Sequence, residues 1–306
     1  MAQLRSSFAE LYDNIDKAIY TLLFDAQKEL PRIWTQFFNV QKSDKKFERV
    51  MTVTGMGDVP EKGEGAPYTT ELIKTGWTKD FTHVEYGFSF EVSETALEDD
   101  QYDQLAQHAR WMMFSARVVE EKKAHNVLNN GFTTELSPDG VSLFNTAHVL
   151  KGGGTARNTL SASADLSVTS LTNALIDWQT QTKVESGQYV MPATDLVLLV
   201  PPALEFTADR ILNSTLLPGS ADNDRNAIKA RRNWTLIVSP YFTDDDTWFL
   251  VAGNKKSHGI CSYTRVPISM KPAMTDTRTL NRIYPLRFRR SWGSKWWQGS
   301  FGVQGA

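Results

Sequence analysis

Residues 93–131 constrain the fold most, because nothing in them breaks a helix before Asn129, Asn130 and Gly131, which are typical of a helix end. Apolar residues recur at helical spacing along two opposite sides of this stretch. One side holds Tyr102, Leu105, Ala109, Met112, Ala116 and Val119, and the other holds Trp111, Phe114 and Val118. The pattern predicts a helix over about residues 100–130, roughly 45 Å long at ~1.5 Å per residue.

A helix that is apolar on two sides must be covered on two sides. One interpretation is a central helix buried inside any large domain. The other is a long helix with its own sheet on one side and another segment or subunit on the other. Between the two apolar sides, the spacing places Arg117 and Glu121 for an i,i+4 ion pair.

Composition limits the class of protein. With 306 residues, 41% of them hydrophobic, the chain can bury a large core as one or two domains. A net charge of −2 gives no broad attraction to nucleic acid or to an anionic membrane. Cys261 is the single cysteine, so the chain has no internal disulfide framework. The sequence contains no apolar run long enough for a transmembrane helix and no signal peptide, so we expect a cytosolic protein or one released without secretion.

The first 30 residues show a second amphipathic pattern, which Pro31 ends. Its apolar face consists of Leu4, Phe8, Leu11, Ile15, Ile19 and Leu22. The pattern predicts a helix that needs a partner. That partner is either the helix's own domain, or a neighbouring copy or helper protein.

Two strands are predicted, over residues 47–54 and 81–92, and the second alternates apolar and polar residues. The segment between them, residues 55–77, is rich in glycine and proline. Connections this long without regular structure are unusual and often functional. We expect a long hairpin that projects from the body and gains order by lying against another copy, the alternative being a mobile surface loop.

The chain beyond Gly131 predicts shorter elements. A turn is expected at residues 138–140, a strand at 141–144, and a flexible break that marks a subdomain boundary at 152–154. Residues 165–265 read as an α/β unit. They contain a helix around Leu171, Leu175 and Trp178 capped by Ser167 or Thr169, a buried strand at 196–200, a helix from Pro201 to about 212, and strands at 234–238 and 248–252. The aromatic tail, residues 266–306, is expected to return beside the long helix.

The sequence contains no catalytic fingerprint. The histidines His83, His108, His125, His148 and His258 are scattered, and none has metal-ligand spacing. Nucleophile-elbow, phosphate-loop and dinucleotide motifs are absent from the sequence. Cys261 is interpreted as a core residue, and Asp244, Asp245 and Asp246 as a solvated turn rather than a cation site. Arg287, Arg289 and Arg290 are interpreted as a solvated strand face rather than a nucleic-acid site. We therefore predict a protein that is not an enzyme, with no catalytic residues, no cofactor and no metal.

The order of these elements, with several short sequence words, resembles the major capsid proteins of tailed bacteriophages, whose fold encapsulins share. The words are EGAP at residues 64–67, EDDQYD at 98–103, VLNNGF at 127–132, DGVSLFNTAH at 139–148, LVPP at 199–202, DDDTWFLVA at 244–252 and the terminal WGSKWWQGSFG. The resemblance spans nearly the whole chain and rests on the order and number of these words.

The resemblance implies an α+β fold of the phage major-capsid type (Hong Kong 97-like). It divides the chain into an N-terminal arm (1–45), an extended loop (46–92), a peripheral domain with a spine helix (93–164), an axial α/β domain (165–265), and C-terminal strands returning to the peripheral domain (266–306). It implies a subunit of an icosahedral head, built from pentamers and hexamers around double-stranded DNA and assembled in the bacterial cytoplasm. Portal and scaffolding proteins are the implied partners, and no membrane is expected. The alternatives are an encapsulin-like compartment shell and a soluble enzyme with a diffuse site.

Overall fold

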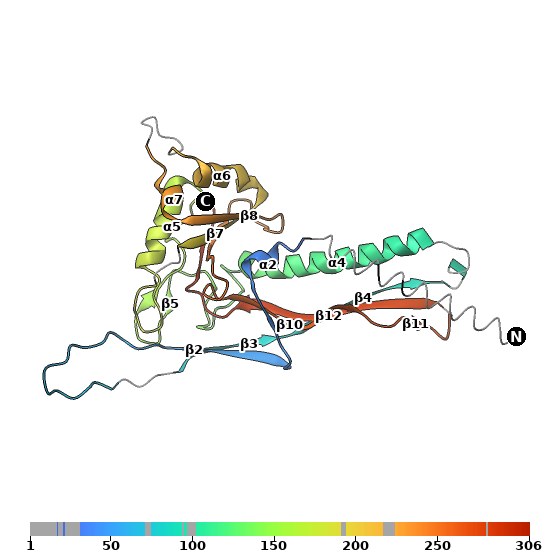
Figure 1. The fold of residues 1–306 in the computed structure, drawn as a ribbon, viewed down its shortest axis with the longest axis horizontal. Coiled ribbons are helices and arrows are strands. Elements are labelled where there is room, and N and C mark those ends of the chain that lie inside the picture. The colour runs from blue at the N-terminus through green and yellow to red at the C-terminus, as the bar shows by residue number, and fades with distance from the viewer. Residues whose placement is uncertain are drawn as a thin grey trace.

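The computed structural model describes residues 31–70, 75–93, 95–96, 102–190, 194–216, 224–279 and 281–306, together with Lys17 and Thr21. These residues form an elongated α+β molecule (Figure 1). A long helix and long strands make one end, a smaller α/β unit makes the other, and a thin hairpin projects beyond that unit. The predicted apolar face at Leu4 to Leu22 lies outside the described residues.

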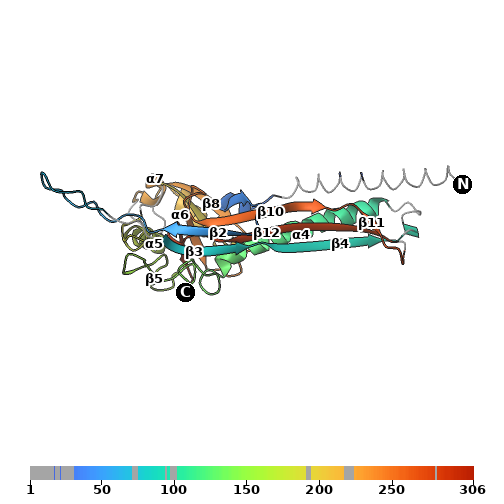
Figure 2. The ribbon, with the colours of Figure 1, turned by 90° about the horizontal axis from the view of Figure 1, so that it is seen from below.

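The long helix, α4 (Tyr102–Asn129), matches the predicted one and lies along a five-stranded sheet (Figure 2). The sheet has the order β1-β10-β12-β11, with β4 also paired to β12. Its strands are β1 (Asn39–Lys42), β4 (Val84–Val92), β10 (Ile260–Met270), β11 (Met274–Thr275) and β12 (Arg282–Ser294). All of its pairs are antiparallel except β1 with β10. Ala109, Met112 and Ala116 of α4 share a core with Tyr284, Leu286 and Phe288 of β12.

A four-stranded sheet, ordered β13-β9-β7-β8, forms the smaller α/β unit. Its strands are β7 (Asp195–Val200), β8 (Asn233–Val238), β9 (Trp248–Ala252) and β13 (Ser300–Val303). β7 is parallel to β8 and antiparallel to β9. Because β7 is central, its residues after Asp195 are all buried, which explains its continuous apolar run.

Helices α5 (Val168–Thr180), α6 (Glu205–Asn213) and α7 (Ala227–Arg231) belong to the same unit. Ser167 is the N-cap of α5: its hydroxyl accepts a hydrogen bond from the Ser170 backbone N–H, and the Ser170 side chain reciprocates. The predicted cap is therefore confirmed at Ser167. The 3₁₀ turn η1 (Pro202–Leu204) leads into α6, as the proline pair predicts.

Two small hairpins and one short helix complete the described fold. β2 (Phe47–Val53) pairs with β3 (Thr75–Thr82) to make the projecting hairpin, and β5 (His148–Val149) pairs with β6 (Thr155–Ala156). The short helix α2 (Trp34–Phe37) packs on α4.

Four local predictions need correction. The strand predicted over 81–92 is two strands that separate at His83, so the hairpin partner of β2 is β3, and β4 belongs to the five-stranded sheet. Residues 141–144 form bends and a single bridge at Ser142, because their backbone follows a compact turn. Residues 152–154 are the turn of the β5–β6 hairpin, with positive φ at Gly153 and Gly154, rather than a flexible break. Of the predicted tail, the end of β10, β11 and β12 lie in the sheet beside α4, whereas β13 joins the four-stranded sheet.

Candidate functional site

The β2–β3 hairpin exposes apolar side chains along its length. Met51 and Val53 of β2 are exposed. Arg49 of β2 and Asp80 of β3 form an ion pair between the two strands, with a nitrogen–oxygen distance of 2.6 Å. Beyond β2, the described residues 54–70 form no regular structure, and Val59 and Tyr68 there are 94% and 83% exposed. Two strands by themselves bury too little to be stable alone. The outer part of this hairpin therefore presents apolar surface that the described residues of its own subunit leave uncovered.

The body fixes the base of the hairpin and so sets its direction. Phe81 of β3 is buried against Tyr263, with ring centroids 5.2 Å apart. Lys79 lies 2.8 Å from Glu135, and Lys151 stands over the Trp77 ring at 3.7 Å. These contacts come from both the α4 end of the molecule and the β5–β6 turn, so the hairpin projects from a rigid base while its tip stays exposed.

The second side of α4 is also uncovered. Trp111 is 56% exposed and Phe114 is 42% exposed, and their rings meet edge to face with centroids 5.7 Å apart. On the first side, Ala109, Met112 and Ala116 are buried in the sheet core. Of the two interpretations of this helix, the described residues therefore agree with a sheet on one side and an uncovered second side, and not with a helix buried on all sides.

On the buried side, one turn after Ala116, α4 contributes to a buried cluster of charges. Glu120 is completely buried, and arginines from three elements surround its carboxylate. Arg290 of β12 lies at 3.2 Å, Arg117 at 3.1 Å and Arg32 at 3.6 Å. Burial raises the pKa of Glu120, while Arg290 and Arg32 act in the opposite direction. The cluster joins the segment before α2, the long helix and the sheet.

Glu121 anchors α2 to α4. Its carboxylate accepts hydrogen bonds from the backbone N–H of Ile33 at 2.7 Å and of Trp34 at 3.1 Å, at the first turn of α2. Burial raises the pKa of Glu121 to about 7, against the lowering effect of these two bonds. His125, one turn later, donates from Nδ1 to the Glu121 carbonyl at 2.8 Å and meets the Phe37 ring at 5.3 Å. The sequence predicted Glu121 as an ion-pair partner of Arg117, but its carboxylate is committed to the α2 backbone, and Arg117 pairs with Glu120.

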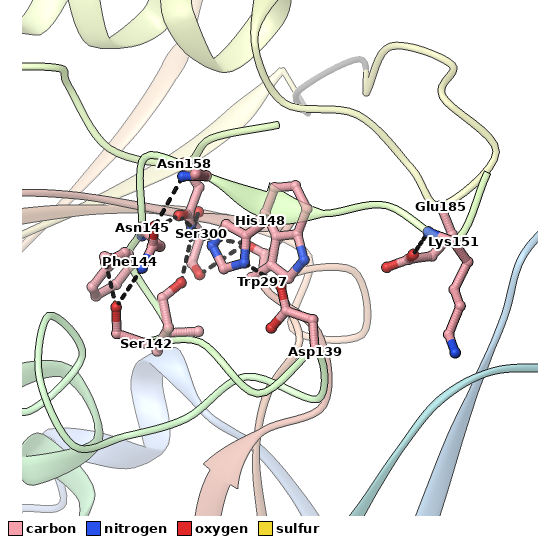
Figure 3. A network of polar contacts seen from close by, with 12 residues as sticks. Asp139, Ser142, Phe144, Asn145, His148, Lys151, Asn158, Glu185, Trp297 and Ser300 are labelled. Carbon is pink, nitrogen blue, oxygen red and sulfur yellow. Dashed lines mark hydrogen bonds and ion pairs between the residues drawn. The ribbon is translucent and has the colours of Figure 1, made fainter. Parts of the chain in front are cut away.

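The segment DGVSLFNTAH, residues 139–148, takes part in a network of polar contacts. This network connects the chain after α4 to the C-terminal tail (Figure 3). His148 lies between Asp139 at 2.6 Å and Asn158 at 3.0 Å, and its ring stacks on Trp297 at 4.0 Å. The Asn158 side-chain amide donates to the carbonyl oxygens of Leu143, Trp297 and Ser300. Every one of these groups serves to close loops over the core, so we interpret the network as structural.

The other residues with potential chemistry lie apart. His83 bridges Ser43 and Ser291, His258 accepts from the Ile260 backbone N–H, and His108 is exposed. Cys261 is buried, which raises the pKa of its thiol to about 12. Asp244 accepts from Thr247 and from the Asp246 backbone in an exposed turn, as predicted.

The described part of the chain contains neither a metal site nor a transmembrane helix. No group of three or more histidine, cysteine or acidic residues there is arranged to hold a metal ion. Nor does that part contain a helix with the length and hydropathy needed to cross a bilayer.

The three tail arginines differ from the prediction in one respect. Arg287 and Arg289 pair with the exposed Glu85 at 3.4 and 3.9 Å, as expected of a solvated face. Arg290 is buried, pairs with Glu120, and stands 4.8 Å over the Trp34 ring. The interpretation of Arg290 as solvated is therefore wrong, because the strand alternates faces and turns this side chain into the core.

Comparison with known protein families identifies the family of this chain. The profile of a family described as phage capsid protein matches residues 78–299, more than half of the chain. The chain belongs to the phage capsid protein family. It is a structural subunit of a phage head, and the family match favours this function over the encapsulin-like compartment shell. Comparison with curated protein sequences finds no match.

Solved structures show that this capsid protein has the Hong Kong 97-like fold. The capsid of cyanophage P-SCSP1u superimposes with a TM-score of 0.60 at 12% identity, covering 90% of this chain and 88% of that one. Mycobacterium phage Che8 gives 0.55 at 12% identity, covering 90% and 93%. A virus-like particle from Pyrococcus furiosus gives 0.54 at 12% identity, covering 94% and 98%.

The sequence did not predict the buried charge cluster around Glu120 or the anchoring of α2 by Glu121. Glu120 and Arg290 are 170 positions apart, and no spacing within one element connects them. The pair Glu120-Glu121, directly after the apolar positions Ala116 and Val119, was the available signal, since buried acidic residues require partners. The exposed surfaces, in contrast, follow from the two-sided helix and the long glycine-rich connection.

Proposed function

We propose that copies of this chain assemble as pentamers and hexamers into an icosahedral phage head that encloses double-stranded DNA. The observation that carries the proposal is the projecting β2–β3 hairpin with the exposed Val59 and Tyr68. Side chains of this kind stay in water on a lone subunit and lose that exposure when the hairpin lies across a neighbour.

Assembly would follow from repetition of modest contacts. A hairpin that docks on a different surface of the next subunit makes a heterologous contact, and such contacts close into rings around symmetry axes. Each subunit would then hold several neighbours at once, so weak individual contacts add up to a stable shell. In this assignment the hairpin is the extended loop, α4 and the five-stranded sheet form the peripheral domain, and the β7-centred sheet forms the axial domain at the five-fold and six-fold centres.

The remaining partners are proposed from the family. Portal and scaffolding proteins would take part in assembly in the host cytoplasm, and packaged DNA would meet the inner wall through non-specific contacts. The net charge of −2 supports the last point, because a nearly neutral wall holds DNA without binding it tightly.

Loop variants test the proposal. Residues 57–68 are replaced by a short glycine–serine linker, and in a second variant Val59 and Tyr68 are both changed to serine. The matched control changes Glu61 and Glu64, which are exposed on the same loop, to serine. Negative-stain microscopy and sedimentation velocity should show shells for the unaltered chain and the control, and small species for both loop variants. Normal shells from the loop-replaced chain would refute the role given to the hairpin.

A further inference from the structure

The smaller α/β unit has two edges at the ends of its central strands. β7 and β8 are parallel, and they pair in register from Asp195 with Asn233 to Val200 with Val238. The amino ends of both strands therefore share one edge of the sheet, and the carboxyl ends share the other. At ~3.3 Å per residue these edges are roughly 17 Å apart.

The carboxyl edge is acidic and carries an uncovered aromatic ring. Residues 201–209 and 239–247 follow β7 and β8 directly, and these two segments contain five acidic residues and no basic one. The acidic residues are all exposed, and they are Glu205, Asp209, Asp244, Asp245 and Asp246. Phe206 follows Glu205 in the first turn of α6 and is 77% exposed.

The amino edge has the opposite charge. Residues 224–232 pass through α7 into β8, and they contain four basic residues but only one acidic residue, Asp224. The basic residues are Arg225, Lys229, Arg231 and Arg232, and the first three are exposed. In Figure 1, α7 lies on the left of the unit beside α5, and α6 extends to its right. The two charged surfaces therefore lie on opposite flanks of one unit.

This arrangement fits a second copy of the chain better than any other partner. Nucleic acid would use the basic edge alone, and it would leave the acidic edge and Phe206 in water. A metal ion is a poor match for the acidic edge, because the described residues contain no group of three or more potential ligands arranged to hold one. A second copy satisfies both edges, since its basic edge is complementary to the acidic one in charge.

We propose that the acidic edge of one subunit, with Phe206, docks on the basic edge formed by α7 of the next subunit. Because the two surfaces differ and lie on opposite flanks, the contact is heterologous and repeats from copy to copy around an axis. The inference rests on the proposed function, in which the β7-centred sheets meet at the five-fold and six-fold centres. It adds the pair of surfaces that join them, which is separate from the contact made by the β2–β3 hairpin.

Charge reversal in the full-length chain tests this contact. One variant changes three residues of the acidic edge, Glu205, Asp245 and Asp246, to lysine. A second changes three residues of the basic edge, Arg225, Lys229 and Arg231, to glutamate. A third carries all six changes, so its net charge is that of the unaltered chain. Asp244 is kept, because it accepts hydrogen bonds within its own turn from Thr247 and the Asp246 backbone.

The yield of shells is measured by sedimentation velocity after circular dichroism has shown that each subunit is folded. Each three-residue variant should form roughly tenfold fewer shells than the unaltered chain, because like charges then face each other across the contact. The six-residue variant should assemble better than either, because opposite charges face each other again. Normal assembly of the three-residue variants, or a folded six-residue variant that assembles no better than they do, would overturn the proposal.

The aromatic ring is tested separately. Phe206→Ser should lower the yield of shells, whereas the matched control Val149→Ser should not, since Val149 is 51% exposed but belongs to the β5–β6 hairpin. Equal yields for the two variants would exclude Phe206 from the contact. If the unaltered chain forms no shells, the proposed function fails together with this contact, whereas shells that tolerate the charge reversals overturn the contact alone.

A second measurement uses the unaltered sequence and so does not depend on a variant folding. Shells are assembled from equal amounts of ¹⁵N-labelled and unlabelled chains and treated with a carbodiimide, which joins a lysine amine directly to an adjacent carboxylate. Mass spectrometry should find Lys229 linked to carboxylates of residues 205–209 or 244–246 in peptide pairs of mixed label. The exposed Lys123 of α4 is the control and should form no such link. Links confined to single chains, or equal linking of Lys123, would contradict the proposal.

Discussion

At the scale of single residues, Glu120 is the side chain on which most of the interior depends. Its carboxylate neutralises Arg290 and Arg117, which are both buried. Removing one partner of a buried charge pair leaves the other charge without compensation, which costs far more than the pair itself contributes. Arg290 is also held over Trp34, so the loss would extend to the segment around α2.

We predict that Glu120→Gln lowers the free energy of unfolding by about 3–5 kcal/mol. Glu85→Gln is the matched control, because Glu85 also pairs with arginines of β12 but is exposed, and it should cost less than about 1 kcal/mol. Chemical denaturation of the unassembled subunit measures both values. Equal losses for the two variants would show that burial of the charge does not control its contribution.

The shifted pKa values of His125 and Glu121 predict how stability depends on pH, and their effects on stability run in opposite directions. Burial lowers the pKa of His125 to about 4 from an ordinary 6.5, so the unfolded chain takes up this proton first, and stability is lost as pH falls from 6.5 toward 4. Burial raises the pKa of Glu121 from 4.5 to about 7, so the folded chain binds this proton first, and stability is lost as pH rises from 4.5 to 7.

Two single substitutions separate these effects. His125→Gln should reduce the loss of stability between pH 6.5 and 4, and Glu121→Gln should make that loss steeper, because the opposing carboxyl is gone. Denaturation midpoints measured at half-unit steps of pH give the two slopes. If both substitutions shifted the slope in the same direction, the assignment of the two protonation states would be wrong.

At the scale of elements, the β2–β3 hairpin should be far less protected in a free subunit than the central strand β7. It forms a two-stranded sheet, whereas β7 lies in the middle of a four-stranded sheet with its side chains buried. We predict that amides of Phe47–Val53 exchange with solvent much faster than those of Asp195–Val200 before assembly. In shells the hairpin amides should become protected, because a neighbour would cover them. Hydrogen exchange followed by mass spectrometry reads both states, and a hairpin that exchanges equally fast in both would not be an assembly contact.

The elements differ in how far their sequence predicted them. The long helix, the buried β7 and the capped α5 are confirmed, because periodicity, a continuous apolar run and a serine cap are local signals. The split at His83 was missed because alternation continues through both strands, and only the pairing of β4 with β12 separates them. The placement of β13 beside β9 was missed for the same reason, since pairing partners are distant in sequence.

At the scale of the whole molecule, the described residues combine buried contacts between distant segments with apolar surfaces that stay exposed. The charge cluster at Glu120 and the Asn158 network bind the segment around α2, the long helix and the tail into one body. The exposed hairpin projects from that body (Figure 1), in agreement with the assembly role that we propose for it. The sequence predicted the exposed surfaces better than the interior, because exposure follows from pattern while buried polar contacts depend on the complete fold.

The most direct measurement is cryo-electron microscopy of particles formed by the full-length chain. We predict closed shells with five-fold and six-fold clusters, in which residues 54–70 of each subunit lie across an adjacent copy and Val59 and Tyr68 are buried there. A map in which the hairpin folds back on its own subunit, or a preparation that contains only monomers under all assembly conditions, would contradict the account.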